Sequence, residues 1–256
     1  MIGRRRKGPR WAHTASATGW GESTFAEIAW DKSRGAAARW AAAGVVLGVL
    51  GGLIAFAPAA WLAGAIASAT SQRLLLADAR GTVWSGSAVV LLTGGPDSRD
   101  ASALPGRLDW TLGIKGLGLE LRARHECCIN GTAALQVKPG FGRVTLALAP
   151  SPGWVGQWPS AWLGGLGTPW NTMQLGGSLR LASPGLSVES VQGRWRLAGS
   201  ADLDLIDVSS RVSTLETLGS YRLSIAADPS GNGAADLTLA TERGALQLSG
   251  NGTLSP

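Results

Sequence analysis

The pattern of apolar and polar residues divides the chain into two parts with different periodicities. Residues 40–72 form a run of 33 without one charged side chain, between Arg39 and Arg73. About 20 apolar residues are enough to cross the hydrocarbon core of a bilayer. A buried helix of a soluble domain seldom runs this long without a polar face, and a signal peptide has a shorter apolar region. The run predicts a transmembrane helix over residues 40–69, which Pro58 should kink or end because it lacks an N–H group.

Two kinds of residue within this run bear on how the helix would sit in a membrane. Trp40 and Trp61 fall where indoles lie at the two membrane–water interfaces. Glycines recur at every fourth position on one helical face, and this spacing lets a second helix approach closely. Glycine is also common in membrane helices in general. The candidate helix-packing face consists of Gly44, Gly48 and Gly52.

From residue 73 onward, apolar residues recur with a period of two, which is typical of half-buried β-strands. Short turns such as Lys138-Pro139-Gly140 and Pro184-Gly185 separate the alternating segments. Short turns join antiparallel strands, because parallel strands need long crossovers. The pattern predicts a mainly β domain over residues 73–256, with about ten to twelve antiparallel strands. The alternating apolar residues are Leu108, Trp110, Leu112 and Ile114; Val144, Leu146 and Leu148; Leu179 and Leu181; Tyr221, Leu223 and Ile225; Leu237 and Leu239; and Leu246 and Leu248.

Tryptophans occur both inside and outside these alternating segments. Trp84, Trp110 and Trp195 are in phase with apolar strand neighbours and are predicted to face the covered side of the sheet. Residues 150–171 lack alternation, and we expect this segment to be irregular or briefly helical and to join two halves, 73–149 and 172–256. Its indoles can pack on the domain's own core, touch the membrane surface or hold a partner. Core packing is favoured because an indole buries a large area. These four indoles are Trp154, Trp158, Trp162 and Trp170.

Charge is concentrated at the N-terminus. Residues 1–39 hold eight basic and three acidic residues, a net charge of +5, whereas residues 73–256 hold 15 basic and 14 acidic residues. By the positive-inside rule the basic tail stays in the cytoplasm and the β domain is exported. The tail has too little apolar periodicity to build a core, so we expect residues 1–39 to be disordered. The near-neutral main domain is not expected to bind nucleic acid.

The sequence contains no recognisable catalytic constellation. It has no G-x-S-x-G elbow, no phosphate-binding glycine loop and no dinucleotide-binding motif. His125 is the one histidine after residue 73, so a histidine-rich zinc site cannot be built there. Asp202, Asp204 and Asp207 follow strand alternation and lack the Gly and Glu of a calcium loop. We therefore expect no enzyme activity, no cofactor and no metal.

Two adjacent cysteines, Cys127 and Cys128, are the only ones in the chain. In an oxidising compartment they are either a vicinal disulfide or free thiols. Neighbouring residues close no loop, so a disulfide between them is not a structural staple. The simplest reading is two small buried residues in a turn before Asn130-Gly131, with His125 nearby as a weak argument for a metal ligand.

Several short motifs resemble one family. They are G-T-V-W-S-G-S-A (81–88), L-P-G-R-L-D-W (104–110), Q-L-G-G-S-L (174–179), the Gly193-x-Trp195 strand, and the segments 202–223 and 241–252. Together with the single N-terminal span they resemble the N component of the bacterial type II secretion system. The resemblance covers residues 40–256. The basic tail and the cysteine pair fall outside it.

The resemblance implies a single-pass protein of the bacterial inner membrane, with a periplasmic antiparallel β-sheet domain that is curved or AsmA-like. It implies an accessory subunit that helps to export folded periplasmic proteins and whose partners are other inner-membrane secretion subunits. It supplies no catalytic residues. An envelope lipid-handling protein with an AsmA-like apolar groove is the alternative, with a lipid as the ligand. An apolar sheet face left open would favour the lipid, and polar outer faces throughout would favour the structural subunit.

Overall fold

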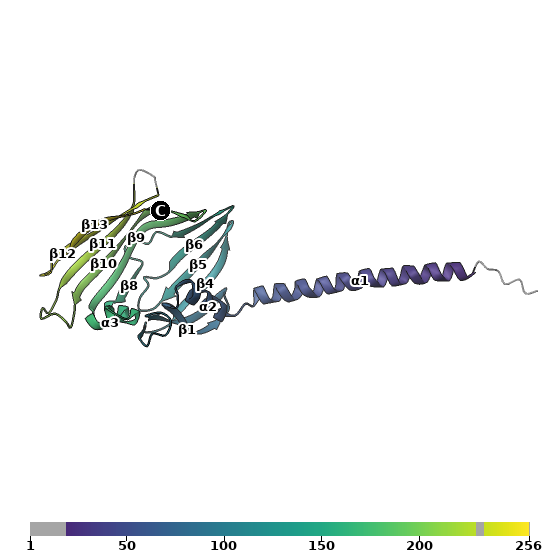
Figure 1. Ribbon diagram of the computed structural model, residues 1–256, viewed down its shortest axis with the longest axis horizontal. Coiled ribbons are helices and arrows are strands. Elements are labelled where there is room, and N and C mark those ends of the chain that lie inside the picture. The colour runs from purple at the N-terminus through teal and green to yellow at the C-terminus, as the bar shows by residue number, and fades with distance from the viewer. Residues whose placement is uncertain (1–18, 229–232, 256) are drawn as a thin grey trace, which may run out of the picture. The chain divides into compact units, whose positions relative to one another are not determined.

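The computed structural model describes residues 19–228 and 233–255 (Figure 1). The chain divides into two units, with the boundary between Ala55 and Phe56. The first unit contains one long helix and the second contains the whole β-sheet.

Helix α1 (Gly19–Ala55) is longer at its N-terminal end than the predicted span. Its stretch Ala37–Ala55 is long and apolar enough to cross a membrane, and none of it is buried. The expectation of disorder for residues 1–39 is wrong from Gly19 onward, and its first part, residues 1–18, lies outside the described residues. Extending an existing helix adds one hydrogen bond for each residue fixed, so a helix formed by the apolar stretch grows easily into the preceding segment.

The predicted helix over residues 40–69 is not continuous. α1 ends at Ala55, and a second helix, α2 (Ala59–Ala69), begins after Pro58. Pro58 has extended backbone angles, φ −63° and ψ 145°, and it forms a bridge to Thr82. Proline cannot donate a backbone hydrogen bond, and it restricts the residue before it. One apolar run therefore forms two helices, of which α2 belongs to the β unit.

The second unit is an open sheet of 13 antiparallel strands, which confirms the predicted fold class. The sheet runs in chain order from β1 to β13, except that β3 pairs only with β2 and β8 pairs only with β9. The strands are β1 (Leu74–Gly81), β2 (Ser85–Thr93), β3 (Ala101–Ala103), β4 (Leu108–Lys115), β5 (Gly118–His125), β6 (Ala133–Gly140), β7 (Arg143–Leu148), β8 (Gly156–Pro159), β9 (Gly176–Val191), β10 (Arg194–Ser209), β11 (Gly219–Ala227), β12 (Ala235–Arg243) and β13 (Ser249–Leu254). β3 and β8 are too short to show alternation in the sequence.

The two predicted halves form one sheet, because β7 pairs directly with β9. The segment between them, predicted to be irregular or briefly helical, contains β8, a 3₁₀-helix η1 (Ser160–Leu166) and the single-turn helix α3 (Trp170–Met173). Figure 1 shows α3 at one end of the sheet, and α3 contacts η1.

The register places apolar side chains in rows across one face of the sheet. One row crosses five adjacent strands as Leu112, Leu121, Leu135, Leu148 and Leu186. A second row crosses six strands as Ile114, Leu119, Val137, Leu146, Val188 and Leu197. The opposite face carries polar cross-strand pairs such as Glu120 with Gln136, and Asp204 with Arg222. Because side chains alternate between the faces, this register fixes which face needs covering.

Two clusters of buried residues cover part of the apolar face. The larger cluster contains Ala59 of α2 and residues of β1, β2 and β4, and Leu62 and Ile66 pack against it. Its buried members are Ala59, Leu76, Ala88, Val90, Leu104, Trp110 and Cys128. The smaller cluster contains Leu175, Val208 and Tyr221, with Trp170 and Met173 of α3 packed against it.

The three strand-borne tryptophans differ in burial. Trp110 is 3% exposed, and its indole donates to the Val83 carbonyl at 3.1 Å. A Cβ on the facing Gly86 would lie 2.6 Å from the Trp110 ring, so only glycine leaves room for it. Trp84 is half-buried. Trp195 lies on the same face of β10 as Leu197, as predicted, but it is 55% exposed, because it packs against neither of the two clusters formed by the described residues.

We expect Trp110→Ala to lower the free energy of unfolding of the full chain by about 3–5 kcal/mol, because it removes a buried indole and leaves a cavity. Trp195→Ala is the matched control and should change this free energy by less than about 0.5 kcal/mol, as exposed positions do. Denaturant unfolding in detergent, followed by circular dichroism, measures both. Equal losses would contradict the burial described above.

Candidate functional site

The candidate helix-packing face lies within α1. Apart from the neighbouring backbone of α1 itself, no heavy atom of the described residues lies within 4 Å of the position that a Cβ would take at Gly44, Gly48 or Gly52. The face is therefore open in the structure, and its use as a contact between helices stays a prediction.

The four indoles of residues 150–171 lie against the sheet unit itself. Trp158 and Trp162 pack against the larger cluster, and the Trp162 indole donates to the Ser102 carbonyl at 3.1 Å. Trp170 packs against the smaller cluster. The Trp154 ring lies 6.0 Å from the guanidinium of Arg180, within the range of a cation–π contact. These contacts make the segment a partial cover for the apolar face.

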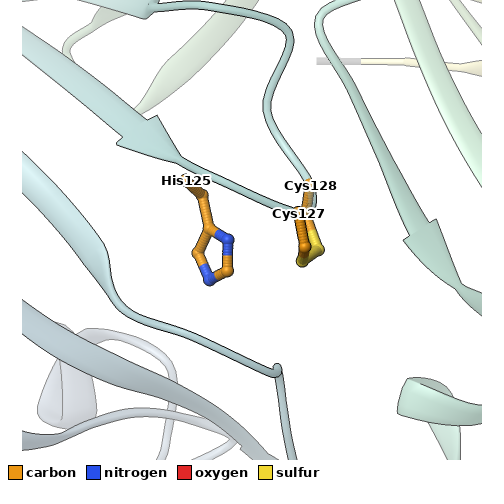
Figure 2. Close-up of side chains that lie close together, drawn as sticks. All are labelled: His125, Cys127 and Cys128. Carbon is orange, nitrogen blue, oxygen red and sulfur yellow. A yellow bond between two sulfur atoms is a disulfide. The ribbon is translucent and has the colours of Figure 1, made fainter.

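Cys127 and Cys128 form a vicinal disulfide beside His125, in the turn that follows β5 (Figure 2). Cys128 and His125 are buried, whereas Cys127 is exposed. One ring nitrogen of His125 and the two cysteine sulfurs lie within 4.8 Å of one another. The turn is tied to β8, because the Cys128 carbonyl accepts the Gln157 N–H at 2.9 Å.

The chemistry of this cluster depends on the oxidised sulfurs. A metal ion binds a cysteine as a thiolate, and a disulfide offers none. His125 is only 3% exposed, and neither of its ring nitrogens has a hydrogen-bond partner among the described residues. Burial lowers the pKa of His125 below its ordinary value, against the opposing influence of Asp109 and Glu126. The oxidised cluster is therefore a neutral imidazole beside a disulfide, which fits neither a metal centre nor an acid–base pair.

The polar face carries a charge cluster over β4, β5 and β6. Glu120 is buried beneath Lys115 and Arg122, and it accepts bonds from both, the Arg122 bond being 2.6 Å long. These two cations hold the pKa of the Glu120 carboxyl below its ordinary value. The cluster lines a cleft of about 600 Å³ together with Asp109, Arg124 and Gln136. The Glu120 carboxylate is neutralised by its two partners, whereas the Asp109 carboxylate at the same cleft is exposed.

The two outer strands of the sheet differ in how they are protected. β1 has a register shift between Ala77 and Arg80, and Asp78 there binds Arg80 and Arg107 in ion pairs. β13 pairs with β12 without any register shift, all of its residues are exposed, and it carries no charge. Charges and bulges are the usual devices that keep an edge strand from pairing with another chain. Among the described residues, nothing pairs with the outer edge of β13.

The sequence analysis missed a second exposed feature, at the hairpin turns of three neighbouring strand pairs. We define the tip surface as residues 114–118, 138–144 and 191–196. Each turn combines glycine with a bulky apolar residue and with basic residues, as in Lys115-Gly-Leu117 and Phe141-Gly-Arg143. This recurrence is visible in the sequence, but only the register shows that the three turns share one end of the sheet.

The fold defines a class of protein: among the described residues, one helix long and apolar enough to cross a membrane is followed by an open antiparallel sheet. Residues 72–256 match the family described as type II secretion system (T2SS), protein N. The chain belongs to this family and is a type II secretion component. A comparison with curated proteins finds no match. A comparison with solved structures finds none either.

The environment of His125 generates a pH prediction. Its pKa is lower in the folded chain than the ordinary value of about 6.5, so the unfolded chain takes up the proton first as the pH falls. The contribution of the neutral imidazole to the free energy of unfolding is therefore present above about pH 6.5 and is lost as the pH falls below this value. We expect the thermal midpoint to fall between about pH 7.5 and pH 5.5, and to fall less in His125→Leu. Above about pH 7.5 the two profiles should run parallel; an equal fall in both would contradict the assignment.

Proposed function

We propose that this type II secretion component is an accessory subunit of the bacterial inner membrane that acts by binding other secretion subunits, not by turnover. The edge of β13 is the observation that carries the proposal. An extended segment of a partner can add to such an edge through main-chain hydrogen bonds. The two edge strands of the same sheet therefore differ: β1 is protected by charges against pairing with another chain, whereas β13 is not.

The membrane location is supported by two features of the N-terminal part. The stretch Ala37–Ala55 has the length and composition of a span. The preceding residues are basic, which favours a cytoplasmic tail and a periplasmic sheet. Gly44, Gly48 and Gly52 would then bring α1 close to a helix of a partner subunit.

The apolar face favours a second candidate function, envelope lipid handling. The leucine row that crosses β4 to β9 is half-buried, and α2, η1 and α3 do not extend over all of it. An open apolar face of this kind fits acyl chains as well as it fits an apolar protein surface.

Proline substitutions in β13 test the proposed docking edge. Neighbouring residues in a strand point their N–H groups in opposite directions, one toward β12 and one outward. Of the two variants Asn251→Pro and Gly252→Pro, we expect one to keep the thermal midpoint of the full chain and to lose co-purification with inner-membrane secretion subunits. The other should lose stability, because it removes a bond to β12.

Asn251→Ala is the control, and it should keep both stability and partners because it leaves the main chain intact. If both proline variants keep the partners, β13 is not the docking edge.

Gly44→Leu with Gly48→Leu and Gly52→Leu should weaken the same co-purification if α1 contributes a packing face. Stoichiometric phospholipid, recovered with the full chain after detergent exchange and without any secretion subunit, would favour lipid handling instead.

A further inference from the structure

The three turns of the tip surface lie at nearly the same height along six adjacent strands. Ile114, Val137 and Val188 belong to one row of the register, and the three turns begin two to four residues beyond this row. At about 3.3 Å per residue the turns therefore end within about 7 Å of one another. Six strands at about 4.8 Å give the surface a width of about 24 Å. Three hairpin turns thus form one continuous edge.

The apolar side chains on this edge are exposed and contribute nothing to a core. Leu117 is 97% exposed, Phe141 is fully exposed, and Ile114 and Trp195 are largely so. None of the four belongs to either buried cluster. Apolar side chains that are exposed together on one surface mark a site that meets a membrane or a partner.

Charge is segregated onto the same edge. The tip surface holds five basic residues and no acidic residue, although residues 73–256 as a whole are nearly neutral. Two of the five pair with acidic residues just inside this edge, Lys115 with Glu120 and Arg143 with Glu189, which leaves three without an acidic partner among the described residues. The segments at the opposite end of the sheet (94–107, 126–132, 149–175 and 210–218) hold four acidic and three basic residues. The basic residues of the tip surface are Lys115, Lys138, Arg143, Arg194 and Arg196. The charge of this edge is therefore complementary to that of an anionic surface.

The entry of the chain into the sheet unit lies at this end. The Ala57 carbonyl accepts the Val83 N–H at 2.9 Å in the β1–β2 turn, and Trp84 of that turn accepts the Leu112 N–H at 2.7 Å. Leu112 precedes the row of Ile114 by two residues. Phe56 and Trp61 beside this entry are exposed. Phe56 directly follows the apolar stretch of α1, so a span that ends at Ala55 leaves Phe56 at the membrane surface.

We infer that the tip surface rests on an anionic phospholipid bilayer, with its apolar side chains among the headgroups and its basic side chains on the phosphates. The inference rests on the proposed membrane location. A bilayer fits better than an acidic protein, because the apolar side chains project from turns and the chain enters the sheet at the same end. Apolar and basic residues together are the usual composition of surfaces that bind at the headgroup level. Each basic residue near an anionic membrane favours the docked state by about five-fold.

Depth-dependent quenching in nanodiscs tests the inference with the full chain. In a Cys127→Ser, Cys128→Ser background, an environment-sensitive fluorophore is placed through Leu117→Cys at the tip surface. The matched control is Val212→Cys, an exposed apolar position at the opposite end of the sheet. A third position, Val46→Cys in α1, reports insertion of the span. The discs contain phosphatidylethanolamine and phosphatidylglycerol, and two quencher lipids are used in separate preparations. A nitroxide near the headgroup reports on position 117, and a nitroxide deep in the acyl chain reports on position 46 in the middle of the span.

We expect strong quenching and a blue-shifted emission at positions 46 and 117, and neither at position 212. Arg143→Gln with Arg194→Gln should reduce the quenching at position 117, as should discs made of phosphatidylcholine alone. Quenching at position 46 without quenching at 117 would overturn the inference and leave the membrane location standing. Absence of quenching at both would overturn both. If position 117 is shielded only in complexes purified with secretion subunits, the tip surface binds protein and the inference fails.

Discussion

Each strand of the sheet sends alternate side chains to one apolar face, and a sheet of one layer has nothing of its own to cover that face. The other elements of the unit follow from this requirement. α2 covers β1 and β2 around Ala59 and Leu76, and α3 covers the strands around Tyr221. Where these covers end, the leucine rows are only half-buried. The burial of any side chain is therefore set by its distance from a cover as much as by its own polarity.

Pro58 decides how the apolar residues are shared between the two units. The uncharged run is continuous in composition, but its first part forms α1 and its last part forms α2 in the core of the sheet. Ala59 is among the most buried residues of the chain, although it lies in a run that resembles a membrane span throughout. Hydropathy measures transfer out of water and does not distinguish lipid from a protein core. The backbone restriction at proline makes that distinction here.

Local patterns in the sequence were enough to predict the class of fold. The alternation around Trp110 identifies β4 and its covered face, because a period of two has one structural reading. Trp195 has the same alternation but is exposed. Its exposure could not be predicted, because no local pattern shows which strands a helix distant in the sequence will cover. The candidate surfaces were harder to predict. Only the pairing of strands shows that β13 lies at an edge of the sheet and that the turns of the tip surface lie side by side. The hydrophobic pattern does not specify these pairings residue by residue.

The order of the strands has a consequence for how the chain reaches this structure. From β4 to β7 and from β9 to β13, each strand pairs with the next one along the chain. Most strand pairings thus join neighbours along the chain, so little loop entropy must be lost before each pairing forms. A chain that emerges from its N-terminus can add one hairpin at a time to strands already in place. Growth in this direction makes β13 the last strand to be added, so its outer edge becomes available only when the rest of the sheet is complete.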